Sequence, residues 1–170
     1  MPEPSSSLTL MPAGHIRRTV RRMAMQIAED FNSGEQVLLV GINTRGNHFA
    51  RLLREALLHT GIAETGLINL NVHGMELAGA VGAGELSTAS HILLIDDVLF
   101  SGSTMMQALR FVLDHATPQV IKMAVLVDRG HRMFPIQPDY AGIVSPTKFN
   151  EHVRVSFQED GTPAAVMLQV

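Results

Sequence analysis

The chain has 170 residues, of which 46% are hydrophobic, so it is long enough to bury a large core within one domain. Its 13 Lys and Arg and 16 Asp and Glu give a formal net charge of −3, which argues against binding of nucleic acid through bulk positive charge. The absence of cysteine excludes disulfides and thiolate metal sites and fits a cytoplasmic protein, and no stretch is apolar enough to predict a membrane span.

Residues 1–13 contain neither a basic segment nor a long apolar run, which predicts a disordered lead-in rather than a signal peptide. Residues 14–170 are predicted to form a single domain that begins with a helix over 14–32. The apolar stripe of this helix consists of Ile16, Val20, Met23, Ile27 and Phe31. Off the stripe lie four arginines, Arg17, Arg18, Arg21 and Arg22. We interpret them as a solvated helix face, with a local basic surface as the alternative.

The rest of the chain alternates between apolar runs of strand length and stretches with helical periodicity. Strands are predicted over 36–42, 65–72, 91–96 and 120–128, helices over 47–59 and 103–115, and a glycine-rich loop over 73–87. This alternation predicts an α/β fold whose mostly parallel sheet is covered on both faces and binds ligands at the carboxyl ends of its strands. The runs 152–157 and 164–170 predict an antiparallel hairpin.

The most informative stretch is the apolar run that ends in Asp96 and Asp97 and continues through a short loop into a helix. Carboxylates at the edge of a core cost several kcal/mol unless something compensates them, which predicts a ligand. Backbone N–H groups at the start of a helix favour a phosphate, and two adjacent acids suit the hydroxyls of a sugar, so a ribose 5-phosphate is the predicted ligand. A helix cap formed by the acids is the alternative, but the helix is expected to begin about six residues later.

These residues also carry a resemblance to a known family. The stretch IDDVLFSGST, residues 95–104, resembles the phosphoribosyl pyrophosphate (PRPP) motif of type I phosphoribosyltransferases. GINTRG, residues 41–46, is similar to the pyrophosphate loop of that family. Residues 124–155 are similar to the hood and closing strand of its PyrR branch, the pyrimidine attenuation proteins that are also uracil phosphoribosyltransferases. Three motifs in the expected order are more specific than one glycine-rich loop.

The resemblance implies a fold and a reaction. The fold is the type I phosphoribosyltransferase fold, a twisted and mostly parallel sheet flanked by helices, with a small hood over about 129–150 and a carboxyl-terminal β-hairpin. The reaction is the transfer of ribose 5-phosphate from PRPP to a pyrimidine base, uracil, with UMP and pyrophosphate as products. Relatives that act on purines carry an acid where this chain has Phe100, which favours a pyrimidine here.

The resemblance also implies roles for individual residues. The predicted catalytic set is Arg45, Asp96 and Asp97, in which the two acids bind the ribose hydroxyls. The 5-phosphate would be held by Phe100, Ser101, Gly102, Ser103 and Thr104. Pyrophosphate would contact Thr44, Arg45 and Gly46, and the base would face Asp128, Arg129 and Arg132. No direct metal ligand is predicted, because Mg²⁺ would be carried by PRPP and would meet Asp96 or Asp97 through water.

The chain departs from the family pattern in the segment that would cover the pyrophosphate leaving group. The family places a basic residue in a loop over the pyrophosphate, whereas this sequence has no Lys or Arg between Arg54 and Arg110. His73 is the one candidate cation in the corresponding stretch. This departure favours a second hypothesis, in which a regulator of the same fold senses PRPP or a nucleotide without catalysis.

Partners are predicted from the same resemblance. The relatives assemble as homodimers or larger homo-oligomers, and we expect the same of this chain. RNA is a further predicted partner, but the attenuation proteins carry basic side chains or histidine where this chain has Met25, Gln137 and Ile143. Since RNA affinity comes largely from neutralised phosphates, these replacements predict weak and salt-sensitive binding.

Overall fold

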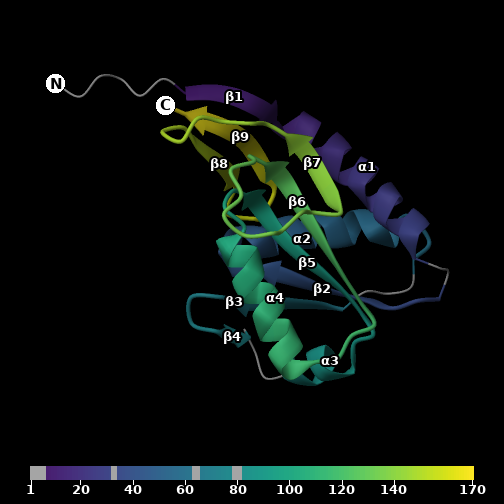
Figure 1. Ribbon diagram of the computed structural model, residues 1–170. Coiled ribbons are helices and arrows are strands. Elements are labelled where there is room, and N and C mark those ends of the chain that lie inside the picture. The colour runs from purple at the N-terminus through teal and green to yellow at the C-terminus, as the bar shows by residue number, and fades with distance from the viewer. Residues whose placement is uncertain (1–6, 32–33, 63–65, 78–81) are drawn as a thin grey trace.

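The computed structural model describes residues 7–31, 34–62, 66–77 and 82–170 (Figure 1). Its helices are α1 (Ala13–Asp30), α2 (Asn43–Leu58), α3 (Gly82–Thr88) and α4 (Ser103–His115). Its strands are β1 (Ser7–Pro12), β2 (Val37–Ile42), β3 (Leu67–Asn71), β4 (Glu76–Leu77), β5 (His91–Leu99), β6 (Val120–Asp128), β7 (Tyr140–Val144), β8 (His152–Phe157) and β9 (Pro163–Gln169). Within the described ranges, no helix has the length and apolar character needed to span a membrane.

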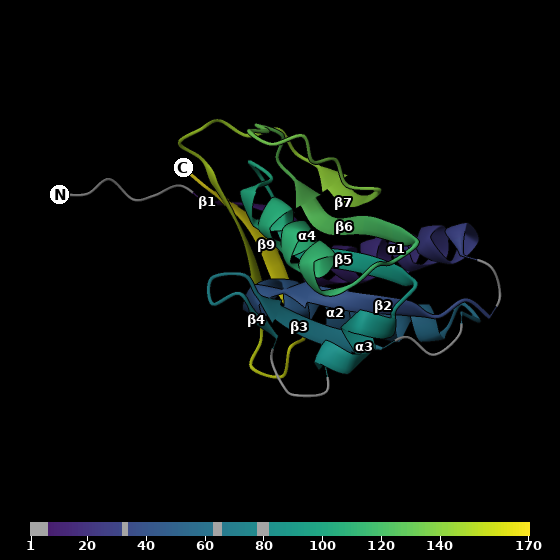
Figure 2. The same ribbon diagram turned by 60° about the horizontal axis from the view of Figure 1, so that its bottom comes forward.

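Six strands form the main sheet in the order β4-β3-β2-β5-β6-β7. Neighbouring strands from β3 to β7 are parallel, and the two-residue strand β4 pairs antiparallel with β3. Figures 1 and 2 show α1 and α2 on one face of this sheet and α3 and α4 on the other. The predicted α/β class is therefore confirmed, and the carboxyl ends of the five parallel strands lie along one edge, where such sheets bind ligands.

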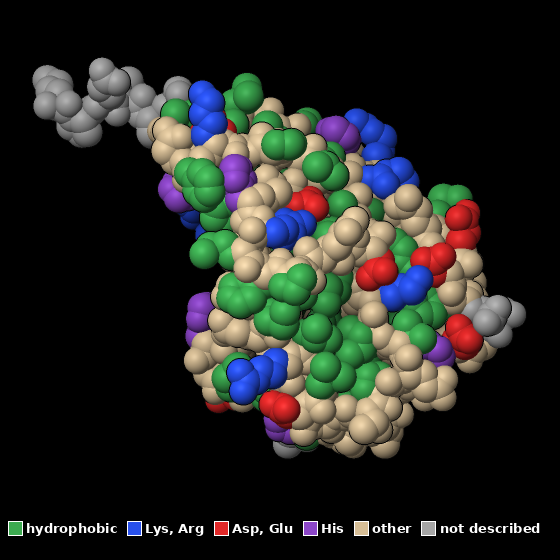
Figure 3. All heavy atoms as spheres, viewed as in Figure 1, with side chains coloured by type: hydrophobic (Ala, Val, Ile, Leu, Met, Phe, Trp, Pro, Cys, Tyr) green, Lys and Arg blue, Asp and Glu red, His purple; other side chains and the backbone are tan. Residues whose placement is uncertain are grey.

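Two apolar cores lie on the two faces of the main sheet, because its strands are buried on both sides and their side chains alternate. On one face Leu39 of β2 packs in a cluster with Phe49 of α2, and on the other Val40 packs in a cluster with Val112 of α4. The second core also includes partly buried side chains on and beside α4, namely Met106, Leu109, Ile121 and Ala141. Figure 3 shows apolar side chains gathered on this face of the molecule. The two helical layers fix the strand ends that carry the site.

A second, antiparallel sheet has the order β1-β9-β8, and its β8–β9 pair confirms the predicted hairpin. The prediction of disorder over residues 1–13 is wrong for residues 7–13, because these form β1 and the first residue of α1. Residues 1–6 lie outside the described part of the chain. Pairing with β9 satisfies the backbone of β1, and Met11 is fully buried in the core, so contacts with the distant end of the chain order this segment.

Three predicted boundaries differ in ways that bear on the site. Helix α2 begins at Asn43 rather than at the predicted residue 47, so residues 43–46 of the predicted pyrophosphate loop form its first turn. Strand β5 continues past the predicted end at residue 96 to Leu99, because it pairs with β6 as far as Asp128. The predicted loop over 73–87 contains β4 and the short helix α3. Both predicted acids therefore lie within a central strand.

Candidate functional site

Asp96 and Asp97 lie near the carboxyl end of β5 and are each only 8% exposed. The backbone N–H of Asp97 donates a hydrogen bond of 2.9 Å to Oδ1 of Asp96. Burial raises the pKa of Asp96 well above its ordinary value, and the charge of Asp97 raises it further. Burial also raises the pKa of Asp97, although the charge of Arg45 acts in the opposite direction. A buried acidic pair with perturbed pKa values is typical of a functional site.

The first turn of α2 lies directly against these acids because Gly46 has no side chain. A Cβ atom at Gly46 would lie 2.8 Å from the carbonyl oxygen of Ile95 and 3.1 Å from Oδ1 of Asp96, which is too close for real side chains without a shift. The structure thereby brings predicted residues from three elements together around an open pocket of about 350 Å³: Thr44, Arg45, Gly46, Asp96, Asp97 and Thr104. Thr44 and Arg45 are exposed there, so their side chains are accessible to a ligand.

The turn from β5 to α4, which was predicted to bind a phosphate, is tight and closely packed. Gly102 has a φ of 85°, a left-handed conformation that glycine adopts readily, and a Cβ atom there would lie 3.1 Å from Cβ of Ile136. The N–H of Ser103 donates a hydrogen bond of 3.2 Å to Oγ of Ser101. Of the five predicted phosphate-binding residues, Thr104 lines the acid pocket, and the other four lie on the adjoining turn. The start of α4 is thus close enough to the acids for one ligand to reach both.

Arg132 braces this turn from the hood segment, which we define as residues 129–150. Its guanidinium donates to the carbonyl oxygens of Phe100 (2.9 Å) and Ile136 (2.8 Å) and pairs with the carboxylate of Asp128 at 2.7 Å. The structure therefore gives Arg132 and Asp128 a positioning role, which sequence reasoning missed. Their contact with a base stays a prediction.

Arg129 lies buried beneath an aromatic cluster, which we define as Phe100, His131 and Phe149. The guanidinium carbon of Arg129 lies 4.3 Å from the centre of the Phe100 ring, and its Nε donates to Oγ1 of Thr147 at 2.9 Å. Burial lowers the pKa of Arg129. The ring centres of the cluster lie between 4.5 and 6.1 Å apart. The cluster was not predicted as a unit, and it offers an aromatic surface beside the phosphate loop.

A second hollow, of about 610 Å³, adjoins the acid pocket and shares Asn43 and Thr44 with it. Asn43 has a φ of 53°, in the left-handed region that asparagine tolerates better than most residues. Its Oδ1 accepts a hydrogen bond of 3.1 Å from the N–H of Val72. His73, the candidate cation of the sequence, lines this hollow. Sequence reasoning missed Asn43, although an asparagine directly after a buried strand is a recognisable signal for a positive φ.

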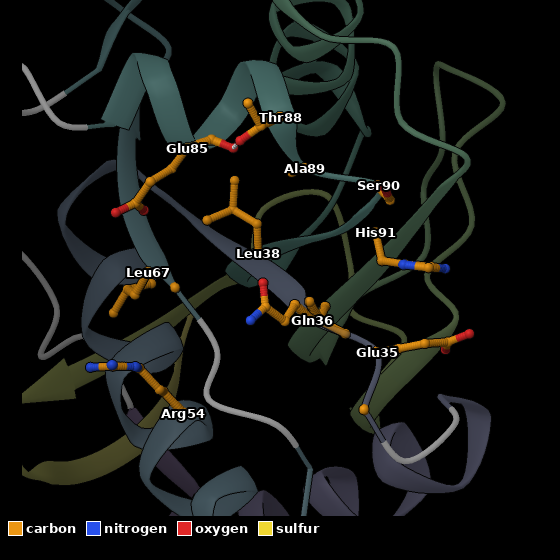
Figure 4. A pocket seen from close by; sticks show the side chains of 13 residues that line it. Glu35, Gln36, Leu38, Arg54, Leu67, Glu85, Thr88, Ala89, Ser90 and His91 are labelled. Carbon is orange, nitrogen blue, oxygen red and sulfur yellow. Dashed lines mark hydrogen bonds between the residues drawn. The ribbon is translucent and has the colours of Figure 1, made fainter.

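A larger cavity, of about 800 Å³, lies at the opposite edge of the sheet, at the amino ends of β2 and β5. Figure 4 shows that its side chains include Arg54 of α2, Glu85 of α3 and His91 of β5. The charges along its wall have both signs, and it contains none of the predicted site residues. Because sheets of this class bind ligands at the carboxyl ends of their strands, we assign the function to the acid pocket.

Comparison with known proteins identifies the family to which this site belongs. The phosphoribosyl transferase domain model matches residues 9–160. The chain belongs to the phosphoribosyltransferase family. The bifunctional protein PyrR of Nostoc punctiforme (strain ATCC 29133 / PCC 73102) is 38% identical over 170 residues, which cover 94% of this chain and 95% of the relative. The bifunctional protein PyrR of Geobacter sp. (strain M21) is 33% identical over 175 residues, which cover 97% of this chain and 99% of the relative. The predicted resemblance is therefore confirmed.

Solved structures of phosphoribosyltransferases share the fold. The hypoxanthine phosphoribosyltransferase of Trypanosoma cruzi has a TM-score of 0.70 at 16% identity, with 94% of each chain covered. A hypoxanthine-guanine phosphoribosyltransferase of Bacillus anthracis str. 'Ames Ancestor' has a TM-score of 0.66 at 17% identity, with 84% of this chain and 85% of that chain covered. At such identities the likeness concerns the fold alone, and it confirms the predicted phosphoribosyltransferase fold.

Proposed function

We propose that this phosphoribosyltransferase transfers ribose 5-phosphate from PRPP to a pyrimidine base, with uracil as the base and UMP and pyrophosphate as the products. The observation that carries the proposal is the buried pair of Asp96 and Asp97, which shares one pocket with the first turn of α2 and the start of α4. The two PyrR relatives, matched over nearly their whole length, support an activity of this kind.

The pocket would hold PRPP in one orientation. Backbone N–H groups and hydroxyls at the start of α4 would bind the 5-phosphate, and the carboxylates of Asp96 and Asp97 would accept hydrogen bonds from the ribose hydroxyls. Pyrophosphate would then lie beside Thr44 and Arg45, because the first turn of α2 forms the next wall of the pocket. A guanidinium at this position stabilises the charge that develops on the leaving group.

The proposed reaction breaks the bond between C1 of the ribose and an oxygen of pyrophosphate, and it joins C1 to a ring nitrogen of uracil, which loses its proton. The transition state resembles an oxocarbenium ion, as in glycoside hydrolysis. Ionised Asp96 and Asp97 would stabilise the positive charge on the ribose ring, and Arg45 would stabilise the negative charge on pyrophosphate. The catalytic contribution of the chain is therefore mainly electrostatic.

Mg²⁺ would enter the site on the oxygen atoms of PRPP. In the part of the chain that the structure describes, no group of three or more His, Cys, Asp or Glu side chains is arranged to hold a metal ion. Asp96 and Asp97 offer hard oxygen donors, directly or through water, which fits an ion bound mainly by its substrate and by water. When bound, the ion would neutralise part of the pyrophosphate charge.

The aromatic cluster would face the base, because the hood segment follows β6, which lies on the side of β5 opposite to β2, the strand that leads into α2. Phe149 is 75% exposed, so its ring is accessible to a planar ligand. Phe100 favours a pyrimidine as the base, because an acidic side chain that could assist a purine nitrogen is absent at this position. Arg129 and Arg132 would act on the base indirectly, through the ring and the loop that they hold in place.

A second candidate function is a regulator of the same fold that binds PRPP or a nucleotide without turnover. The observation that favours it is the absence of Lys and Arg over residues 55–109 of the sequence. Loss of one charge-assisted contact to a leaving group costs on the order of 10²-fold in rate.

A turnover assay with uracil, PRPP and Mg²⁺ distinguishes the two functions. We expect UMP to form, and we expect Asp97→Asn to lower kcat/KM by about 10²-fold or more because it removes a charge beside the ribose. Asp114→Asn, at an exposed position of α4, is the matched control and should leave the rate unchanged. Tight binding of UMP or PRPP without product would support the regulator, and no binding of either ligand would contradict both functions.

We also propose that the protein is cytoplasmic, forms a homodimer or larger homo-oligomer, and binds RNA weakly. Arg17, Arg18 and Arg21 are exposed on α1, whereas Arg22 donates to the carbonyl oxygen of Gly142 at 2.5 Å. One of the four arginines therefore helps to hold β7. Sedimentation analysis tests the assembly, with a monomer as the contradicting result. A salt titration with a leader-RNA hairpin tests the RNA partner, and affinity no better than that for unrelated RNA would exclude it.

A further inference from the structure

The order of the strands places the leaving group of the proposed substrate next to the hollow that contains His73. Along the carboxyl edge, β5 is followed by β2 and then by β3. A ligand whose phosphate lies on the turn after β5 and whose ribose lies on the acids extends past the first turn of α2 toward the end of β3. The pyrophosphate of PRPP would therefore reach the turn between β3 and β4.

The hollow at this end of the site adjoins the acid pocket and carries several polar side chains. It is lined by Asn43, Thr44, Asn69, Asn71, His73, Glu76 and Leu77, of which the first two also line the acid pocket. Among the side chains that line the two pockets, Arg45 and His73 are the ones that can carry a positive charge. A dianionic or trianionic group that entered the hollow would thus meet amide donors, the hydroxyl of Thr44 and one imidazole, with Glu76 as the one carboxylate in the lining.

Hydrogen bonds hold the turn that carries His73 close to the first turn of α2. Nδ2 of Asn69 donates to the carbonyl oxygen of Asn43 at 3.3 Å, and the N–H of Val72 donates to Oδ1 of Asn43 at 3.1 Å. Oδ1 of Asn71 accepts from the N–H of His73 at 3.1 Å. The backbone of His73 is therefore positioned, while its side chain is exposed to solvent and accessible to a ligand.

We propose that the imidazolium form of His73 binds the pyrophosphate group of PRPP and replaces, in a pH-dependent manner, the permanent cation that this stretch of the chain lacks. The inference rests on the function proposed above. Histidine is the side chain that ordinarily gains its charge between pH 8 and pH 5. The charged groups that face the same space are Glu76 from β4, Arg45 from α2, and Asp96 and Asp97 from β5.

Calorimetry with the full-length chain tests this role without relying on turnover. Magnesium pyrophosphate and UMP are titrated separately into the wild type, His73→Gln and His73→Arg at pH 5.5, 6.5 and 8. UMP occupies the ribose and phosphate sides of the site and has no pyrophosphate, so it reports on the rest of the pocket. His15→Gln, at an exposed position of α1, is the matched control for loss of a histidine. Pyrophosphate itself takes up protons in this range, so the comparison is the ratio between variants at each pH.

We expect His73→Gln to bind pyrophosphate about tenfold more weakly than the wild type at pH 5.5 and with nearly equal affinity at pH 8, because only the charged imidazole adds a charge-assisted bond. His73→Arg should bind at least as tightly as the wild type at pH 5.5 and more tightly at pH 8. The affinity for UMP should be the same in all three proteins. His15→Gln should match the wild type with both ligands.

A constant ratio between wild type and His73→Gln across the pH range would overturn the role of His73 and leave the proposed function intact. An equal loss of affinity for UMP and pyrophosphate in His73→Gln would also overturn it, because the effect would not be confined to the leaving-group side. Failure of the wild type to bind either UMP or magnesium pyrophosphate at any pH would overturn the proposed function together with this inference.

Discussion

The loop between β5 and α4 is held by the hood segment, whereas the turn between β3 and β4 is held mainly by asparagine side chains. In the loop, the carbonyl oxygen of Ser101 accepts from the N–H groups of Met133 (2.9 Å) and Phe134 (3.1 Å), and Arg132 reaches the carbonyl of Phe100. The turn is exposed over residues 73–76. The phosphate side of the site is thus built by contacts between distant segments, and the leaving-group side is a short local structure. Binding of a nucleoside monophosphate should depend on the first side, and turnover on both.

The largest effect is expected from the brace of the phosphate side. Arg132→Met should lower the free energy of unfolding by about 2–3 kcal/mol, because it removes the cationic partner of Asp128 and the guanidinium that donates to the carbonyl oxygens of Phe100 and Ile136. We also expect UMP affinity to fall about tenfold as the loop loosens. Urea denaturation and calorimetry measure the two effects. Arg110→Met, on an exposed part of α4, is the control. If Arg132→Met and Arg110→Met were equally stable, the loop between β5 and α4 would not depend on Arg132 for its conformation.

The contact between the two sides of the site can be tested at Gly46. Gly46→Ala should destabilise the protein by about 1–3 kcal/mol, because the added Cβ meets the carbonyl of Ile95 and the carboxylate of Asp96. Gly84→Ala in α3 is the matched control, since a Cβ there meets nothing within 4 Å. Thermal denaturation of both variants measures the difference. A harmless Gly46→Ala would show that the first turn of α2 can move away from the acids.

The leaving-group side should be less sensitive. Asn43→Ala is expected to cost about 1–2 kcal/mol, because alanine tolerates the φ of 53° poorly and cannot accept the hydrogen bond from Val72. Asn43→Gly removes the same acceptor but accepts the backbone conformation, so it should cost less. The urea midpoints of Asn43→Ala and Asn43→Gly separate the effect of backbone strain from that of the lost hydrogen bond. If Asn43→Gly were less stable than Asn43→Ala, the positive φ at residue 43 would not be the source of backbone strain in the alanine variant.

The smallest effect is expected at the acid pair, where a substitution should raise the stability of the protein rather than lower it. Burial raises the pKa of Asp96, so the folded state binds its proton more tightly than the unfolded state, and stability falls as the pH rises above the ordinary aspartate pKa of about 3.9. Because an amide cannot titrate, we expect Asp96→Asn to raise the melting temperature by a few degrees at pH 7 and to have little effect near pH 3. Scanning calorimetry across this range measures the effect. A variant less stable than the wild type at pH 7 would contradict the assigned cost of burial.

The burial of the acid pair and the turn into α4 were predictable because their signals are local. Asp96 follows an apolar run, and Gly102 with Ser101 opens a helix, so spacing within ten residues carries the whole pattern. The first turn of α2 and strand β1 were mispredicted, since pairing and packing with distant segments extend both elements. Arg132 was predicted from the resemblance to meet a ligand, and the sequence could not show that it binds the carbonyl oxygen of Phe100, which lies 32 residues away in the chain.

By itself, the sequence determined the alternation of strands and helices, the carboxylates at the end of β5 and the missing cations between β3 and β5, because each depends on residue type and spacing. The tertiary structure alone decided that Gly46 lies against Asp96 and that Asn43 holds the turn with His73. It also decided that Arg129 and Arg132 support the site from within the protein. These are contacts across the edge of a folded sheet, and they exist only once the strand order brings the segments together.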